Sequence, residues 1–478
     1  MDDNQLSYTI FLISLFITFS VAVVGRGISY KRKEDDLAGR SLNRWFVGLS
    51  AGATANSGFI VAGAVGLGYT FGMQWIVLSI AWFLGTFVFW HWFPERINAF
   101  GHKSGAITLS EMLHYGLTGR WAKAVSLLVA TVIVIGLSGY TAAQWLAGQK
   151  FLSSAFGFSS QTALAMFALF IIAYSSIGGF RGSVYADTFQ AVIRLFGTAL
   201  ILGSSIWIAF GDLSAFQANI ASAGENFLKP FPNLTLLGAI GFVAGWAVAA
   251  IGFGLGQPQI VSRYLASSSP AETYAARWIY MGYAQFTWIS MTAFGMILRG
   301  IMPDISEPEA GISIFAQTHL FAVVTGIIVA DIFGVIASTA NSLLIAMAQS
   351  IKHDILKNFL PREMRKLPLS IITLLVGIAT MLVSARIGGT VVSLILSAIS
   401  LIAAGLAVPV MIKVMDWRHT GMSLTGTVII GIASAVAWKQ LGFSQYLNEA
   451  AAGMLSSAFT HWVLLRISGY RAVISTPK

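Results

Sequence analysis

Residues 48–58 read GLSAGATANSG, and residues 252–258 read GFGLGQP. Both stretches lie in long apolar segments, and both carry more glycine than a lipid-facing helix needs. Glycine tolerates non-helical dihedrals and Pro258 removes a backbone donor, so each stretch is expected to break its helix and free carbonyl groups. Unwound backbone at membrane depth is tolerated where it lines a cavity or is buried in protein. Broken helices at corresponding positions of two repeats indicate the central site of a transporter. The alternative is that the glycines only allow close helix packing.

The composition places the whole chain in a bilayer. Of its 478 residues 56% are hydrophobic and 10% are charged, and the mean hydropathy is +0.75. A soluble domain is about 25% charged, so soluble enzymes and disordered chains are excluded. The absence of cysteine excludes disulfides and thiolate metal sites. The sequence has no GxxxxGK[ST] loop, which argues against an ATP-driven pump, and no nucleophile–base pair that would indicate an enzyme.

Hydrophobic windows of about 20 residues predict thirteen membrane-spanning helices in one transporter domain, 1–478. The expected spans are 6–25, 45–70, 73–93, 122–146, 162–178, 185–209, 236–262, 278–299, 313–350, 367–385, 389–412, 423–440 and 450–466. The first part of 313–350 is expected to be a separate extracellular helix. We expect an extra N-terminal helix at 6–25, inverted five-helix repeats at 45–209 and 236–412, and two C-terminal helices within 423–466.

The basic residues predict the orientation, because Lys and Arg concentrate in cytoplasmic loops. With the N-terminus outside and the C-terminus inside, most of them fall on the inner side, at 26–44, 96–123, 352–366, 413–418 and 466–478. The net charge of +10 is therefore explained by topology, and no nucleic-acid partner is expected. Segment 6–25 follows Asp2 and Asp3 rather than basic residues, which is not typical of a cleavable signal peptide. These features predict a multi-pass membrane protein; the family resemblance described below implies a bacterial cytoplasmic (inner) membrane.

The expected span at 313–350 carries adjacent hydroxyls at Ser338 and Thr339. Small hard cations take oxygen ligands, so these hydroxyls could join freed carbonyls of the 48–58 stretch around such an ion. The alternative is tight helix packing, since Gly334, Ser338 and Ser342 form a small-xxx-small pattern.

Several motifs together resemble one family. They are GRSL at 39–42, the 50–58 stretch, IGGF at 177–180, ADTFQ at 186–190, GQPQI at 256–260 with Arg263, the Ser338-Thr339 pair and the segment around Asp354. In this order and spacing they resemble the sodium/solute symporter family, with the bacterial sodium/proline symporter group the most similar. The resemblance covers residues 39–360. It implies a leucine-transporter-like, all-α fold of two inverted repeats, thirteen spans and an outside N-terminus.

The resemblance also implies the ion and its ligands. A sodium ion would be bound by the backbone carbonyls of Ala53, Asn56 and Val335 and by the hydroxyls of Ser338 and Thr339. Further residues would support coupling, namely Arg40 and Asp187, which match family positions, and Ser57, which shares a helical face with Ser50 and Thr54.

The substrate pocket departs from the proline group. Tyr140 matches a pocket tyrosine of that group, but Ala250 and Gly254 stand where it has aromatic residues, so the substrate is expected not to be proline. Ala55 replaces an acidic residue, which leaves the coupling ion open between sodium and a proton. The residues expected to line the pocket are Tyr140, Gln144, Trp246, Gly254, Gln257 and Pro258.

Asp331 lies two helical turns before Ser338 inside an expected span, and an intramembrane carboxylate is a functional candidate. It could replace the missing negative charge, carry a proton or pair with Arg194. The alternative is that it is solvated near the outer interface.

The sequence therefore predicts a secondary active symporter. It would couple inward movement of sodium to uptake of a small polar organic solute, an amino acid or a carboxylate, without an obligatory protein partner. A proton-coupled symporter using Asp331, a solute sensor that works with a signalling partner and a passive channel remain as alternatives. The Ser338-Thr339 pair argues against the channel.

Overall fold

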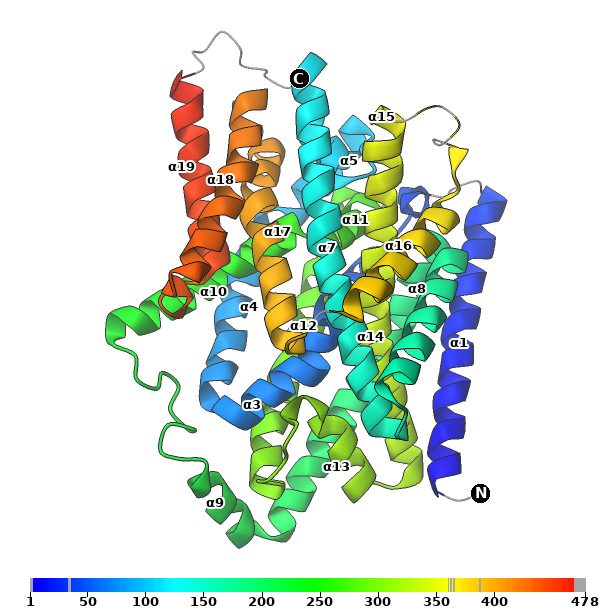
Figure 1. Cartoon of the computed structure of the whole chain (residues 1–478), viewed down its shortest axis with the longest axis vertical. Helices are drawn as coiled ribbons and strands as arrows, with labels where there is room; N and C mark the ends of the chain where they lie inside the picture. Colours follow the sequence, from blue (N-terminus) through cyan, green and yellow to red (C-terminus); the bar gives the residue numbers. More distant parts are fainter. Residues whose placement is uncertain are drawn as a thin grey trace.

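The computed structural model describes residues 3–32, 36–359, 361, 363, 366–386 and 388–467. Some basic residues behind the predicted orientation lie outside these ranges, namely Lys33, Arg362, Arg365, Arg471 and Lys478. The described residues form an all-helical bundle (Figure 1).

The helices follow the expected spans closely. Their bounds are α1 Asp3–Arg32, η1 Leu37–Arg40, α2 Arg44–Gly58, η2 Phe59–Ala64, α3 Val65–Phe71, α4 Met73–Trp92, α5 Pro94–Ser104, α6 Leu109–His114, α7 Gly119–Phe156, α8 Ser160–Gly211, α9 Leu213–Ser222, α10 Leu236–Gly256, α11 Pro258–Leu265, α12 Pro270–Ile301, η3 Pro308–Ala310, α13 Gly311–His319, α14 Ala322–Ser350, η4 Ile351–Leu356, α15 Lys357–Phe359, α16 Leu369–Ser384, α17 Val391–Val414, α18 Gly421–Gln440, η6 Phe443–Gln445 and α19 Glu449–Ile467. The expected division of 313–350 is seen as α13 followed by α14.

Within the described ranges, nine helices are long and apolar enough to cross a membrane. One of them, α8, contains two expected spans, 162–178 and 185–209, separated by a break at Gly179 (φ 60°, ψ −166°). The expected spans at 278–299, 367–385 and 450–466 coincide with α12, α16 and α19. The total of thirteen spans and the orientation remain predictions.

Both stretches that opened the sequence argument break their helices. In the first, Ser57 has φ 52° and ψ −178°, after which the chain continues as the π-helix η2. In the second, α10 ends at Gly256, Gln257 is extended (φ −87°, ψ 104°), and α11 starts at Pro258. Proline suits the first position of a helix, where a donor would be unpaired in any case.

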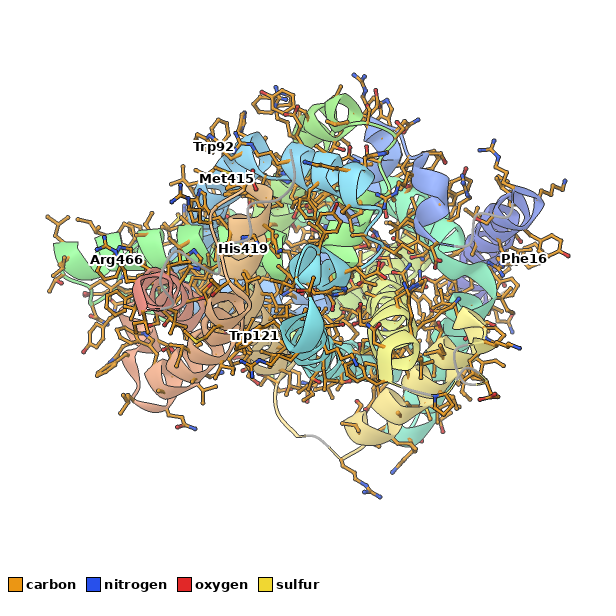
Figure 2. The ribbon with its side chains drawn as sticks, turned by 90° about the horizontal axis from the view of Figure 1, so that it is seen from above. Phe16, Trp92, Trp121, Met415, His419 and Arg466 are labelled. Atoms are coloured by element: carbon orange, nitrogen blue, oxygen red, sulfur yellow. The ribbon has the colours of Figure 1, made fainter. Side chains whose placement is uncertain are left out.

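The broken helix α2 and the helix α14 lie at the centre of the bundle. In each of these spans 83% of the most apolar window is buried, against 22% in α1. Helix α14 packs against α8, α1, α7 and α2. At the periphery, α1 and the α18–α19 pair lie on opposite sides (Figure 1), and Figure 2 shows Phe16 and Arg466 at opposite edges.

Candidate functional site

The α2 break meets α14 at a cluster of oxygen atoms. The Ser338 hydroxyl donates to the Ala53 carbonyl at 3.3 Å and to the Val335 carbonyl at 3.2 Å. The Thr339 hydroxyl donates to the Thr54 carbonyl at 3.0 Å and to the Val335 carbonyl at 3.4 Å. Adjacent ligands around a hard cation with oxygens at about 2.3–2.6 Å have similar mutual spacings. Sodium binding here stays a prediction, and we refer to these five residues, as its candidate ligands, as the sodium site.

Four of the five residues predicted to bind sodium meet in this site. Asn56 does not: its carbonyl accepts the Phe59 N–H, and its side chain donates to Thr287 Oγ1 at 2.9 Å. Thr54 supplies the further carbonyl. In a regular helix the Gly58 N–H would bond to that carbonyl, but here it donates to Gln144 Oε1 at 2.8 Å. Gln144 therefore releases the Thr54 carbonyl toward Thr339.

A central cavity of about 40 Å³ lies on the other side of the α2 break. Its walls come from α2, η2, α4, α7, α10, α12 and α17. The lining residues are Ala55, Asn56, Ser57, Phe59, Ile60, Trp82, Tyr140, Trp246, Phe253, Tyr280, Ala284, Trp288, Ile395, Leu396 and Ile399. That volume has room for only a few water molecules, so the walls must move apart before a solute can enter.

Seven of the fifteen lining residues are aromatic, and Trp82 of α4 lies at the centre of these rings. Its ring centroid lies 5.4 Å from that of Trp288, 5.4 Å from that of Phe253 and 6.3 Å from that of Trp246. Phe59 meets Trp288 edge-on at 5.4 Å. None of the described residues that line the cavity carries a charge.

The predicted pocket residues divide into two groups. Tyr140 and Trp246 line the cavity, whereas Gln144 binds the α2 break and the other three lie elsewhere. Gly254 faces Phe89: a Cβ at this position would come within 2.7 Å of that ring. Gln257 accepts a hydrogen bond from Gln259 at 2.9 Å, and Pro258 lines a separate space of about 10 Å³.

This placement corrects the argument against proline. We expected Ala250 and Gly254 to enlarge the pocket, but Phe89 of α4 occupies the space beside Gly254. Ala250 is buried and is not part of the cavity lining. Neither position therefore enlarges the cavity, and proline remains a candidate.

A second polar cluster lies one turn along α14 from Ser338, around the ion pair between Asp187 of α8 and Arg263 of α11. Arg263 Nη2 donates to Asp187 Oδ2 at 2.9 Å and to Ser342 Oγ at 2.6 Å. Ser50 Oγ donates to the same carboxylate oxygen at 2.9 Å. Both charged side chains are at most 1% exposed. The cluster joins α2, α8, α11 and α14 beside the sodium site.

The remaining predicted coupling residues lie apart from one another. Ser57 forms the α2 break itself. Arg40 donates to the carbonyls of Leu265 at 2.9 Å and Ala106 at 2.7 Å, so it joins the end of α11 to the loop before α6. Asp331 forms an ion pair with Arg194 at 2.6 Å, and neither side chain is exposed. Pairing was one of the roles left open for Asp331; the solvated alternative is wrong.

An ion pair also spans the end of the bundle at which α13 lies (Figure 1). Lys150 of α7 donates to Glu309 Oε2 at 2.9 Å, and Glu309 Oε1 accepts the Val392 N–H at 3.4 Å. These contacts hold η3 against α7 and the start of α17. In this conformation, therefore, ion pairs join the helices on both sides of the cavity and the sodium site.

Comparison with known proteins gives the class of molecule first. A Na⁺-coupled sialic acid symporter in a substrate-bound outward-open state superimposes with a TM-score of 0.80 at 17% identity, covering 99% of this chain and 100% of that one. MhsT in complex with L-phenylalanine gives a TM-score of 0.53 at 14% identity, covering 88% and 99%. The predicted leucine-transporter-like fold is confirmed. The class that these structures define is therefore the leucine-transporter-like fold.

The sequence comparisons give the family. The model of the sodium:solute symporter family matches residues 36–422. The high-affinity proline transporter PutP of Bacillus subtilis is 26% identical over 437 residues, covering 88% of this chain and 89% of the relative. The sodium/proline symporter of Escherichia coli is 27% identical over 463 residues, covering 90% and 88%.

The chain belongs to the sodium:solute symporter family. It is a multi-pass bacterial membrane transporter that couples sodium to the movement of a small solute, and it is not an enzyme.

Proposed function

We propose that this protein is an inner-membrane symporter, with its N-terminus outside, that moves sodium inward together with a small zwitterionic amino or imino acid. One observation carries the proposal. Ala53 and Thr54 contribute carbonyls to the oxygen cluster, whereas Asn56 and Ser57, a few residues later at the α2 break, line the aromatic cavity. An ion at one position therefore shapes the backbone at the other.

The substrate class follows from the charge of the cavity. A solute with net charge would need a counter-charge in a buried site, and the lining supplies none. A zwitterion meets this condition, since aromatic faces attract an ammonium group and backbone donors at a helix break can bind a carboxylate. We therefore favour an amino acid over a simple carboxylate, with proline among the first candidates. Relatives named as proline transporters agree with this choice.

Transport would proceed by alternating access. The Lys150–Glu309 contact at one end and the Asp187–Arg263 contact at the other would open in turn, and the coupling needs only different affinities of the two conformations for each ligand. The substrate can be found with a thermal-shift screen of amino acids, carboxylates and sugars, each with and without sodium, because a ligand stabilises the state that binds it. Ligands that stabilise the protein only together with sodium are expected among the amino and imino acids; stabilisation by sugars alone would contradict the proposal.

Replacing the aromatic wall should weaken substrate binding. Tyr140→Ala, Trp246→Ala and Trp82→Ala each remove an aromatic ring from the cavity lining, and aromatic hot-spot residues of a binding site contribute about 2 kcal/mol or more. We expect at least about tenfold weaker binding of the screened substrate at saturating sodium. Trp207→Ala is the matched control, because that side chain is 81% exposed on α8. Unchanged affinity in all three cavity variants would place the substrate elsewhere.

Replacing Gln144 should affect sodium more than substrate. Gln144→Met keeps the volume but removes the acceptor of the Gly58 N–H, so that donor can return to the Thr54 carbonyl or remain unpaired at a cost of about 1–3 kcal/mol. We expect a higher sodium concentration for half-maximal uptake and little change in substrate affinity at saturating sodium. Gln144→Glu retains an acceptor and should lie between Gln144→Met and the unmodified protein. If Gln144→Met changed substrate affinity but not sodium dependence, Gln144 would be a substrate-binding residue and the role given to it here would be wrong.

A further inference from the structure

Two buried Asp–Arg pairs lie on either side of the sodium site along the contact between α8 and α14. Asp187 and Arg194 are seven residues apart on α8, and Asp331 and Ser338 are seven apart on α14. Seven residues make about two helical turns, or roughly 10 Å, so each set lies on one helical face. Asp187 pairs with Arg263 beside Ser342, which lies one turn after Ser338 on α14. Asp331, which pairs with Arg194, lies two turns before Ser338 on the same helix.

The Arg194–Asp331 pair is fully enclosed. Neither side chain is exposed, and the Nη1–Oδ2 distance is 2.6 Å. Gly197 makes the close approach of α8 and α14 possible, since a Cβ there would come within 2.4 Å of Asp331 Oδ2. Any larger residue at 197 would push the carboxylate away from the helix.

Much of the hydrogen-bonding capacity of this pair is unused. Arg194 Nε and Nη2 and Asp331 Oδ1 have no partner among the described residues, and neither do the neighbouring Gln190 Oε1, Thr198 Oγ1 and Tyr283 hydroxyl. Buried ion pairs stabilise a fold only when their geometry is excellent and the remaining donors and acceptors are satisfied. A purely structural brace is a poor explanation for a pair joined by a single contact.

The pair lies close enough to act on the sodium site through charge. Asp331 is one turn from Val335, whose carbonyl belongs to that site, and Tyr283 packs against Ala53. At roughly 10 Å and an effective dielectric constant of about 20, one unit charge alters ion affinity by about tenfold. Opposite charges held together largely cancel this effect.

We propose that Arg194 and Asp331 form a charge pair that sets the affinity of the sodium site, the carboxylate attracting the ion and the guanidinium offsetting that attraction. The inference rests on the sodium site proposed above. Both residues act on the ion at a distance through their charge, since neither contacts the oxygen atoms of the sodium site.

This role predicts effects of opposite sign, which a structural brace would not give. Asp331→Asn leaves an uncompensated guanidinium and should weaken sodium binding about tenfold. Arg194→Gln leaves the carboxylate, so sodium should bind at least as tightly as to the unmodified protein. The double variant Arg194→Gln/Asp331→Asn removes both charges and should return the affinity to within about threefold of the unmodified value.

The test is binding of radioactive sodium, without substrate, to the purified full chain and its variants. The partly exposed pair Arg44–Glu272, 2.6 Å apart, supplies the matched control: Glu272→Gln also removes a carboxylate from an ion pair and should leave sodium binding unchanged. Equal weakening by Arg194→Gln and Asp331→Asn, or no shift in either, would overturn the proposal. If Asp331→Asn fails to fold, the comparison is between Arg194→Gln and the double variant, in which the double variant must bind sodium more weakly.

Failure of this inference differs from failure of the proposed function. If the unmodified protein binds no sodium, or Thr339→Ala does not weaken binding, the sodium site itself is wrong. If the unmodified protein binds sodium and Thr339→Ala weakens that binding, but the charge variants do not differ from one another in sodium affinity, only the role of the pair is wrong.

Discussion

Replacing Thr339 with alanine is expected to raise the sodium concentration needed for half-maximal uptake by about ten- to a hundredfold. The Thr339 hydroxyl lies 3.0 Å from the Thr54 carbonyl and 3.4 Å from the Val335 carbonyl, and an alanine methyl offers no lone pair to an ion there. Losing one hydrogen-bond-class contact to a charge costs on the order of 1.5–3 kcal/mol, which corresponds to that range. Ser338→Ala should act in the same direction, and substrate affinity at saturating sodium should change much less.

The conservative variant Thr339→Ser is the matched control, because it keeps the hydroxyl and should stay near the unmodified protein. The proton alternative makes a different set of predictions. With Asp331 as proton carrier, uptake would follow pH, ignore sodium and collapse in Asp331→Asn while tolerating Ser338→Ala. Measuring uptake against both gradients in these variants separates the two ions.

Replacing Arg263 with glutamine is expected to destabilise the protein and to open the end of the bundle at α11. The variant leaves the buried carboxylate of Asp187 without its cation and removes the donor to Ser342. Breaking a buried ion pair by removing one partner costs about 3–5 kcal/mol. The expected result is a large loss of thermal stability in detergent, together with loss of coupled uptake.

The opening can be measured directly, because the chain has no cysteine. Gln349 is 3% exposed and lines the small space beside Pro258, so a Gln349→Cys probe should react slowly with a thiol reagent and faster when combined with Arg263→Gln. An exposed Lys357→Cys probe should react equally in both backgrounds. Arg263→Lys keeps the positive charge but offers only one nitrogen, so its labelling rate and its stability should lie between those of Arg263→Gln and the unmodified residue. If Arg263→Gln changed neither the thermal stability nor the labelling rate of Gln349→Cys, the Asp187–Arg263 cluster would not be what closes the bundle at α11.

Features that depend on local backbone chemistry could be predicted from the sequence. The break before Pro258 follows from the glycines and the proline at that position. The break in α2 lies in the predicted stretch, but it falls at Ser57 and not at one of the glycines. The meeting of Ser338 and Thr339 with the α2 carbonyls was one of two interpretations of their position, and the family resemblance favoured it; the structure adds the reason. Gln144 captures the Gly58 N–H, which spacing alone could not show.

Features that depend on contacts between distant helices could not be predicted. Phe89 fills the space beside Gly254, so a glycine that suggested a larger pocket does not enlarge it. Trp82 and Trp288 line the cavity, yet in the sequence they are two of 14 tryptophans. Arg263 was recognised only as part of a motif, because nothing in its spacing indicates that α11 places it against Asp187.

The central claim is that sodium bound by Ser338 and Thr339 drives solute uptake. The most direct test is uptake of the screened solute into proteoliposomes under an inward sodium gradient without a pH gradient, and under an inward proton gradient without sodium. The account predicts concentrative uptake in the first case and none in the second, with Thr339→Ala needing about ten- to a hundredfold more sodium for half-maximal uptake. Uptake that proceeds without sodium and survives both hydroxyl deletions would contradict it.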